Sequence, residues 1–89
     1  MSTQRPPLVE FPCRYPIKVI GDTSDDFERM VADIVERHDP HFERDSIQCR
    51  PSRNGRFLSA SVVIQATGEP QLKALFQDLK ATGRVRMVL

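Results

Sequence analysis

The chain has 89 residues, enough for one small domain that buries about 60% of its unfolded surface, and a second domain does not fit. Thirteen basic and twelve acidic residues give a formal net charge of +1, which excludes wholesale attraction to nucleic acids or membranes and leaves only local charged patches. No apolar run approaches the about 18 residues of a membrane span, so no membrane partner is expected.

The cysteines and the N-terminal segment indicate the compartment and the domain limits. Cys13 and Cys49 lie far apart without a second thiol near either, which excludes a metal-binding knuckle and a CxxC redox pair. Two free thiols suit the reducing cytoplasm. Residues 1–7 are polar and contain proline, unlike a signal peptide. We expect a disordered segment over residues 1–10 and a single domain over residues 11–89.

The first two predicted elements are a strand and an amphipathic helix. Residues 15–20 alternate between apolar and polar side chains, which predicts a strand. Residues 27–38 carry apolar side chains at helical spacing, with Thr23 or Ser24 as a cap at the start and Asp39 at the end. The outer face of this helix predicts a solvated ladder of ion pairs formed by Arg29, Asp33 and Arg37.

A β-hairpin is predicted next. Residues 47–51 and 57–67 flank Asn54 and Gly55, a dipeptide that favours positive φ and therefore a tight reversal. The shorter strand contains Pro51, whose missing N–H is tolerable only at the edge of a sheet. The hairpin therefore places that strand at an edge.

A second helix begins at Pro70 and stops at Gly83, and residues 85–89 alternate as a last strand. The order β-α-β-β-α-β predicts an α+β, ferredoxin-like sandwich. Its four-stranded antiparallel sheet has the spatial order 4-1-3-2, with both helices on one face. Pro16 then falls in a central strand, where only a position at the entry of the strand suits it.

Three loops are expected to meet at one end of this sheet: the turn after the first strand, the hairpin, and the turn before the last strand. Flexible glycines, a helix N-terminus and arginines together favour a site for a carboxylate or phosphate. The candidate ligand-binding residues are Gly21, Asp22, Arg53, Arg56 and Arg84. Asp25 and Asp26 crowd the same end, so a solvated salt-bridge cluster is the simpler alternative.

A second candidate surface is the sheet face that the helices leave open. Strand alternation makes this face cationic and rich in hydrogen-bonding groups, which suits a protein partner bound on the face or at a sheet edge. The candidate partner-binding residues are Lys18, Arg50, Ser59, Ser61 and Arg86. RNA-binding domains of this topology stack bases on aromatic side chains of the central strands, where this chain has serines. RNA binding is therefore a distant third interpretation.

The sequence shows no catalytic constellation. Cys13 could pair as a nucleophile with His38 or His41, but no acidic orienter or oxyanion motif accompanies them. Cys49 alternates inward, where a thiol acts as a small apolar side chain. The two histidines lack further metal ligands. We expect a non-enzymatic protein without a metal ion or cofactor.

Short motifs at characteristic spacing cover nearly the whole chain after Pro7. They are FPC at residues 11–13, KVIG at 18–21, RH at 37–38, PSRNG at 51–55 and VRMVL at 85–89. In these motifs the chain resembles the YbeD-like family of small uncharacterised bacterial proteins. The resemblance implies a ferredoxin-like domain similar to the ACT-type regulatory domains that bind amino acids, and it implies no established activity. ACT domains form their ligand site between subunits around the first turn, and only Gly21 with Asp22 resembles that arrangement.

Two functional hypotheses follow from these surfaces. The first is a regulatory, ACT-like domain that senses a small anionic metabolite at the loop end, or modulates a partner enzyme, and it requires Arg53, Arg56 and Arg84 to be unpaired. The second is a protein interaction module that uses the open sheet face. Both sheet edges are available for pairing, so a homodimer stays open as well.

Overall fold

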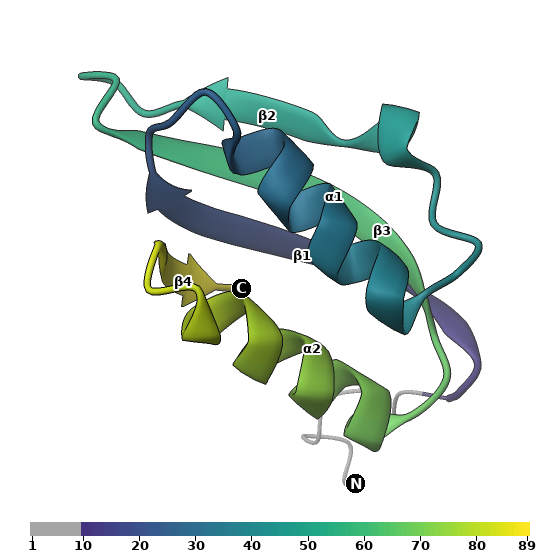
Figure 1. Ribbon diagram of the computed structural model, residues 1–89. Coiled ribbons are helices and arrows are strands. Elements are labelled where there is room, and N and C mark those ends of the chain that lie inside the picture. The colour runs from purple at the N-terminus through teal and green to yellow at the C-terminus, as the bar shows by residue number, and fades with distance from the viewer. Residues whose placement is uncertain (1–9) are drawn as a thin grey trace, which may run out of the picture.

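The computed structural model describes residues 10–89, and the predicted disordered segment lies almost entirely outside them. The described part is an α+β sandwich with the predicted β-α-β-β-α-β order (Figure 1). Its elements are β1 (Cys13–Asp22), α1 (Phe27–His38), the short 3-10 helix η1 (Arg44–Ser46), β2 (Gln48–Pro51), β3 (Phe57–Ala66), α2 (Glu69–Ala81) and β4 (Val85–Val88).

The sheet is antiparallel throughout, and its order β2-β3-β1-β4 is the predicted 4-1-3-2 read from the other edge. β1 and β3 pair along their whole lengths, from Cys13 opposite Ala66 to Asp22 opposite Phe57. β2 and β4 are short edge strands. The ferredoxin-like fold class is therefore confirmed.

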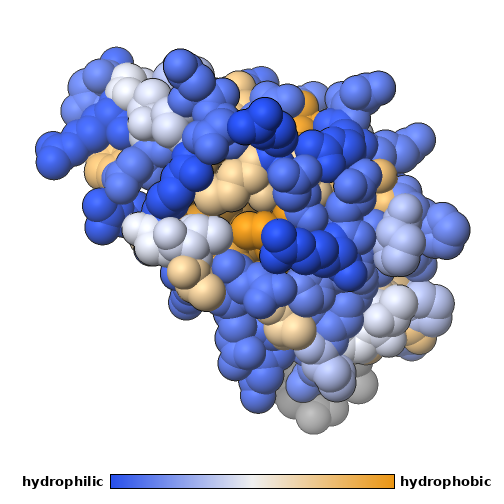
Figure 2. All heavy atoms as spheres, in the orientation of Figure 1, coloured by the Kyte–Doolittle hydropathy of each residue, from blue (hydrophilic) through white to orange (hydrophobic). Residues whose placement is uncertain are grey.

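Both helices cover the same face of the sheet, and the core lies between these layers (Figure 1). Every second residue of β3 from Ala60 to Ala66 points into this core, together with one apolar stripe from each helix. The buried helical side chains are Phe27, Val31, Ala32, Ile34, Val35, Leu72, Leu75 and Leu79. Figure 2 views this helical side, which is mostly hydrophilic, with hydrophobic atoms visible between α1 and α2.

Pro16 lies inside β1, opposite Val63 of β3, and not at the entry of the strand as its chemistry suggested. The N–H of Lys18 points toward β4, where it donates to the carbonyl of Leu89 at 3.1 Å. Since backbone direction repeats every two residues, the nitrogen of Pro16 faces the same side, beyond the paired part of β4. A missing donor costs no ladder hydrogen bond there. Pro51 lies in the edge strand β2, as predicted.

The start of α1 differs from the prediction. Its N-cap is Asp26, which makes no side-chain capping hydrogen bond. The hydroxyl groups expected to cap the helix are used elsewhere, because Thr23 donates to the carbonyl of Gly55 at 2.6 Å and Ser24 donates to Asp26 at 3.1 Å. Thr23 thus joins its loop to the hairpin, and neither hydroxyl caps the helix.

The predicted ion-pair ladder on α1 is also different. Asp33 pairs with Arg44 of η1 at 2.8 Å, and Arg44 contacts Glu36 at 3.0 Å as well. The segment after α1 thus folds back along the helix and supplies the cation that two carboxylates of α1 share.

Candidate functional site

The three loops expected at one end of the sheet do meet there. The N–H of Asp22 donates to the carbonyl of Arg84 at 3.1 Å, and the N–H of Thr23 donates to the carbonyl of Arg56 at 3.2 Å. The hydroxyl of Thr23 reaches the carbonyl of Gly55. The loop after β1 therefore lies between the hairpin and the turn before β4.

Arg84 is committed to an ion pair within this loop cluster. Its guanidinium donates to Asp26 Oδ1 at 2.6 Å and Oδ2 at 3.3 Å, and it also donates to the hydroxyl of Ser24. The hydrogen bond from Arg84, with a further one from Ser24, lowers the pKa of the Asp26 carboxyl, and the hydrogen bond to Asp26 raises the pKa of Arg84. This pairing is the salt-bridge alternative that the sequence left open, and it removes Arg84 as an unpaired cation.

Gly21 has a packing role in this cluster. A Cβ atom on Gly21 would lie 2.5 Å from the carbonyl oxygen of Arg84 and 2.5 Å from Cε1 of Phe27, closer than atoms approach in folded proteins. The glycine is buried, and its missing side chain lets both the carbonyl of Arg84 and the ring of Phe27 approach it closely. The side of Gly21 that a ligand would need is thus occupied by the protein itself.

The two remaining arginines of the predicted anion site lie on the exposed hairpin. Neither Arg53 nor Arg56 takes part in an ion pair within residues 10–89. The guanidinium of Arg56 lies over the ring of Phe57, 5.7 Å from its centroid. The predicted turn is present, since Gly55 has φ +73° and the N–H of Arg56 donates to Asn54 Oδ1 at 3.0 Å.

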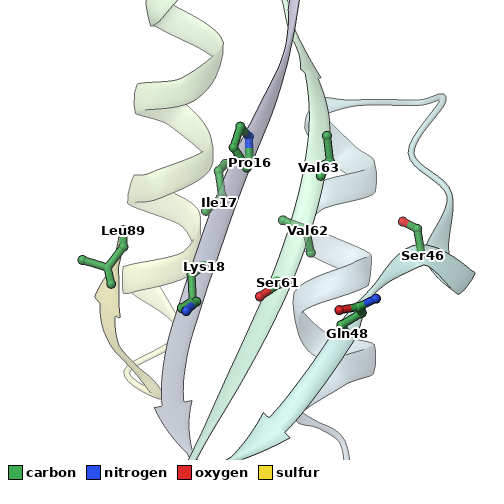
Figure 3. Close-up of a pocket in the computed structure, with 9 residues that line it drawn as sticks. All are labelled: Pro16, Ile17, Lys18, Ser46, Gln48, Ser61, Val62, Val63 and Leu89. Carbon is green, nitrogen blue, oxygen red and sulfur yellow. The ribbon is translucent and has the colours of Figure 1, made fainter. Parts of the chain in front are cut away.

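The open sheet face is ordered in rows of side chains across the strands (Figure 3). One row runs from Gln48 through Ser61 to Lys18 and continues to Leu89, which exchanges two main-chain hydrogen bonds with Lys18 at 2.9 and 3.1 Å. The neighbouring row consists of Arg50, Ser59, Ile20 and Met87. The helices lie behind the sheet in this view, so the rows face outward.

A shallow hollow of about 380 Å³ follows the first of these rows (Figure 3). Its lining residues are Pro16, Ile17, Lys18, Ser46, Gln48, Ser61, Val62, Val63 and Leu89. The large apolar side chains that stay exposed in residues 10–89 all lie on this face: Val63 at 39%, Met87 at 49% and Leu89 at 66%. The face is therefore less polar than the sequence suggested, with apolar side chains between its cations.

Two of the predicted partner-binding cations stand without a counter-ion. Lys18 and Arg50 appear in none of the ion pairs formed within residues 10–89. Arg86, in contrast, holds Asp22 with two hydrogen bonds of 3.1 and 3.0 Å. Among the strand residues of the described part of the chain, Asp22 is the only carboxylate on the open face, and Arg86 neutralises it.

The sequence analysis missed Arg14 as a member of this face. β1 starts at Cys13, two residues before the predicted strand, and Arg14 lies opposite Gln65 at the far end of the sheet. It makes no ion pair within the described part of the chain. The signal was present, because the alternation already begins at Cys13.

A buried polar network joins the end of α1 to β3 and α2, where the sequence analysis predicted only the end of the helix. The carboxylate of Asp39, only 5% exposed, accepts hydrogen bonds from the N–H of His41 at 3.1 Å and of Gln65 at 2.9 Å. Beside it, Gln71 of α2 donates to the carbonyls of His38 at 2.7 Å and Gln65 at 3.1 Å. These hydrogen bonds give partners to main-chain N–H and C=O groups where α1, β3 and α2 meet. Asp39 and Gln71 therefore have a structural role.

The helical side carries a further hollow of about 440 Å³ between α1 and α2. Its charged lining mixes both signs and includes Asp26, Arg29, Asp33, Arg37, Asp78 and Arg84. Asp78 of α2 is bound by His38 of α1 at 2.7 Å, which is an interhelical contact. Because several of these carboxylates are already paired, this hollow favours no ligand of one charge sign.

Residues 10–89 contain no helix that is long and apolar enough to cross a bilayer. The same part of the chain holds no group of three or more His, Cys, Asp or Glu side chains placed to bind a metal ion.

Comparisons with known proteins agree with the sequence motifs. The family model described as "Protein of unknown function (DUF493)" matches residues 6–89. A UPF0250 protein of Azotobacter vinelandii is 55% identical over 84 residues, covering 93% of this chain and 91% of that protein, and one of Pseudomonas aeruginosa is 52% identical over 86 residues, covering 96% and 92%. The solution structure of protein HP0495 from Helicobacter pylori has a TM-score of 0.76 at 22% identity, covering 100% of this chain and 93% of that one. The resemblance to the YbeD-like family and the fold are thereby confirmed.

Proposed function

Because the chain belongs to the DUF493 family of proteins of unknown function, we propose its function from the geometry of its surfaces: it is a non-enzymatic regulatory domain that binds a partner protein on the open sheet face. The observation that carries this proposal is the pair of cations, Lys18 and Arg50, that stand without a counter-ion in residues 10–89 on a hollowed, partly apolar sheet face.

Protein surfaces of this kind suit recognition by another protein. Exposed apolar side chains supply contact area, and surrounding cations and hydroxyls supply orientation and specificity. The shallow hollow suits side chains of a partner better than enclosure of a small molecule, which commonly needs a deeper, mostly buried site. Ser59 and Ser61 occupy the central positions where single-stranded RNA would need stacking rings.

Sensing of a small anion at the loop end is a second candidate, supported by Arg53 and Arg56. These two guanidinium groups lack carboxylate partners within the described residues and belong to the same hairpin turn. An NMR titration with amino acids, short carboxylic acids and nucleotides tests this candidate. Saturable shifts at Gly55 that disappear in Arg53→Glu with Arg56→Glu support it, and a flat response eliminates the ligands tested.

Site-specific cross-linking in cells tests the main proposal. A photo-crosslinking side chain replaces Gln48, which is exposed on the open face, or Gln77, an exposed glutamine of α2 that serves as the matched control. We expect a discrete protein adduct from position 48 and none from position 77. The adduct should be lost when Lys18→Glu is added. Equal adducts from both positions, or none from position 48, would refute binding on the open face.

We expect the domain to act in the cytoplasm, because Cys13 and Cys49 are both free thiols that pack beside the core.

A further inference from the structure

The centre of the open face is Lys18, which has apolar side chains along its own strand and toward β4, and Ser61 directly across on β3. Pro16 and Ile20 precede and follow Lys18 on the same face of β1. Leu89 lies beside Lys18 on the β4 side (Figure 3). Val63 stands diagonally across on β3. Lys18 itself is exposed, so a partner that covers the apolar side chains around it would exclude water from an ion pair formed there and strengthen that pair.

Two further cations flank this centre. From strand geometry, the backbone of Arg14 lies about 13 Å from Lys18 along β1, and that of Arg50 lies about 12 Å away, two strands across. Neither takes part in an ion pair within residues 10–89, and the nearest strand carboxylate on the face, Asp22, is held by Arg86. Around Lys18 and Arg50 the face is therefore complementary to an acidic partner.

The hollows of the face join into one continuous surface. The hollow around Lys18 shares Ser46 and Val63 with a hollow of about 320 Å³ that is lined by Arg14 together with Asp39 and Glu43. It shares Lys18 itself with another of about 340 Å³ that contains Arg50. The combined surface follows β1 for about 20 Å from Arg14 to Ile20, the length of about 13 residues of α-helix.

The backbone arrangement favours a helix over an extended segment as the bound element. The strands β1 and β3 are paired with each other along their whole lengths, so the open face offers side chains and no main-chain hydrogen bonds. An extended segment lying across it would leave its own N–H and C=O groups over the apolar side chains of Pro16, Ile20 and Val63. An α-helix satisfies these groups internally, and its diameter of about 10 Å matches the width of two strands.

We propose that the partner element is an acidic amphipathic helix of about 13 residues that lies along β1 and β3. Its apolar stripe covers Ile20, Val63 and Leu89, one of its carboxylates binds Lys18, and an acidic side chain on its flank faces Arg50. This inference rests on the proposed function and adds the chemistry of the partner to it.

Selection from random peptides of about 14 residues displayed on phage tests the inference. The baits are the full chain, its Lys18→Glu and Arg50→Glu variants, and Lys73→Glu as the control, since Lys73 is an exposed lysine of α2. We expect enriched peptides with net negative charge and apolar residues at i, i+3, i+4 and i+7. Their affinity should fall about tenfold in Lys18→Glu, stay unchanged in Lys73→Glu, and decrease with added salt. The circular dichroism spectrum of each variant verifies its fold.

Several results would overturn the inference. They are enriched peptides that are neutral or basic, apolar residues that alternate with period two, equal binding to Lys18→Glu, or no enrichment at all. A labelled uridine oligonucleotide that binds the full chain more tightly than the selected peptides, and loses affinity in Lys18→Glu, would identify a nucleic acid as the ligand instead.

The cross-linking experiment separates the acidic helix from the proposed function. An adduct at position 48 whose partner segment is not an acidic helix leaves the proposed function standing and rejects only the acidic helix.

Discussion

The buried carboxylate of Asp39 provides the sharpest test of how this fold is held together. Its two oxygens accept the N–H groups of His41 and Gln65, and no ion pair within residues 10–89 involves it. Asp39→Ala leaves both donors without a partner, and each unsatisfied buried donor costs about 1–3 kcal/mol. We therefore expect a loss of about 3 kcal/mol in the free energy of unfolding. For a domain of this size the total is about 4–13 kcal/mol, so the loss is a large fraction.

Urea denaturation followed by circular dichroism measures this loss. With a slope of about 1 kcal/mol/M for a small protein, the midpoint should fall by about 3 M, and the melting temperature by about 12–24 °C. Asp39→Asn retains one acceptor oxygen and should lose about half as much. Asp45→Ala removes an exposed carboxylate of η1 and should change the stability by less than about 0.5 kcal/mol. A loss below about 1 kcal/mol in Asp39→Ala, or an equal loss in Asp45→Ala, would refute the reasoning.

Three further predictions concern the loop end and the thiols. Gly21→Ala should destabilise the domain by about 1–3 kcal/mol, measured by the same denaturation, because the added Cβ overlaps backbone and ring atoms; an unchanged midpoint would contradict this. Because the pKa of Asp26 is lowered, its ion pair with Arg84 stabilises the fold at pH values above the ordinary pKa of 3.8, and this contribution is lost as the pH falls below that value. The free energies of unfolding of Arg84→Ala and of the unchanged protein should therefore differ at neutral pH and converge in acid. Burial, with a smaller contribution from the charge of Glu28, raises the pKa of the Cys49 thiol. This thiol should therefore react with a maleimide much more slowly in the folded chain than in urea, and equal rates would contradict its inward position.

The fold was predictable because the signals for its elements are local. Alternation in residues 57–67, the Asn54–Gly55 turn and the apolar stripe of α1 each depend on neighbours within one element, and all agree with the structure. The position of Pro16 was harder to predict. Whether β1 can accept a proline there depends on how far β4 extends along β1, which is a property of the assembled sheet.

The candidate sites were less predictable because pairing between charges is a tertiary property. Three arginines and three aspartates at the loop end allow many combinations, and sequence spacing does not choose among them. The structure pairs Arg84 with Asp26 and leaves Arg53 unpaired within residues 10–89. The hydrogen bonds of the Asp39 carboxylate could not be predicted for the same reason, because one of its two donors, Gln65, lies 26 residues away in the sequence.

A single irregularity in β4 links the two candidate surfaces. Met87 pairs with Ile20 and Val85 pairs with Gly21, so Arg86 is an extra residue in a β-bulge. In a regular ladder Arg86 would lie opposite Gly21 and point to the helical side, where the ring of Phe27 already fills the space. The bulge instead lets Arg86 reach Asp22 at the rim of the open face.

This displacement decides the charge of the open face. Without Arg86 at the rim, Asp22 would be an unpaired carboxylate one row from Arg50, and the attraction of the face for acidic groups would be weaker. Because Arg86 neutralises Asp22, the positive charges of Lys18 and Arg50 remain uncompensated by any strand carboxylate of residues 10–89. Arg86, predicted as a contact residue, therefore acts on the partner surface mainly by removing a negative charge from it.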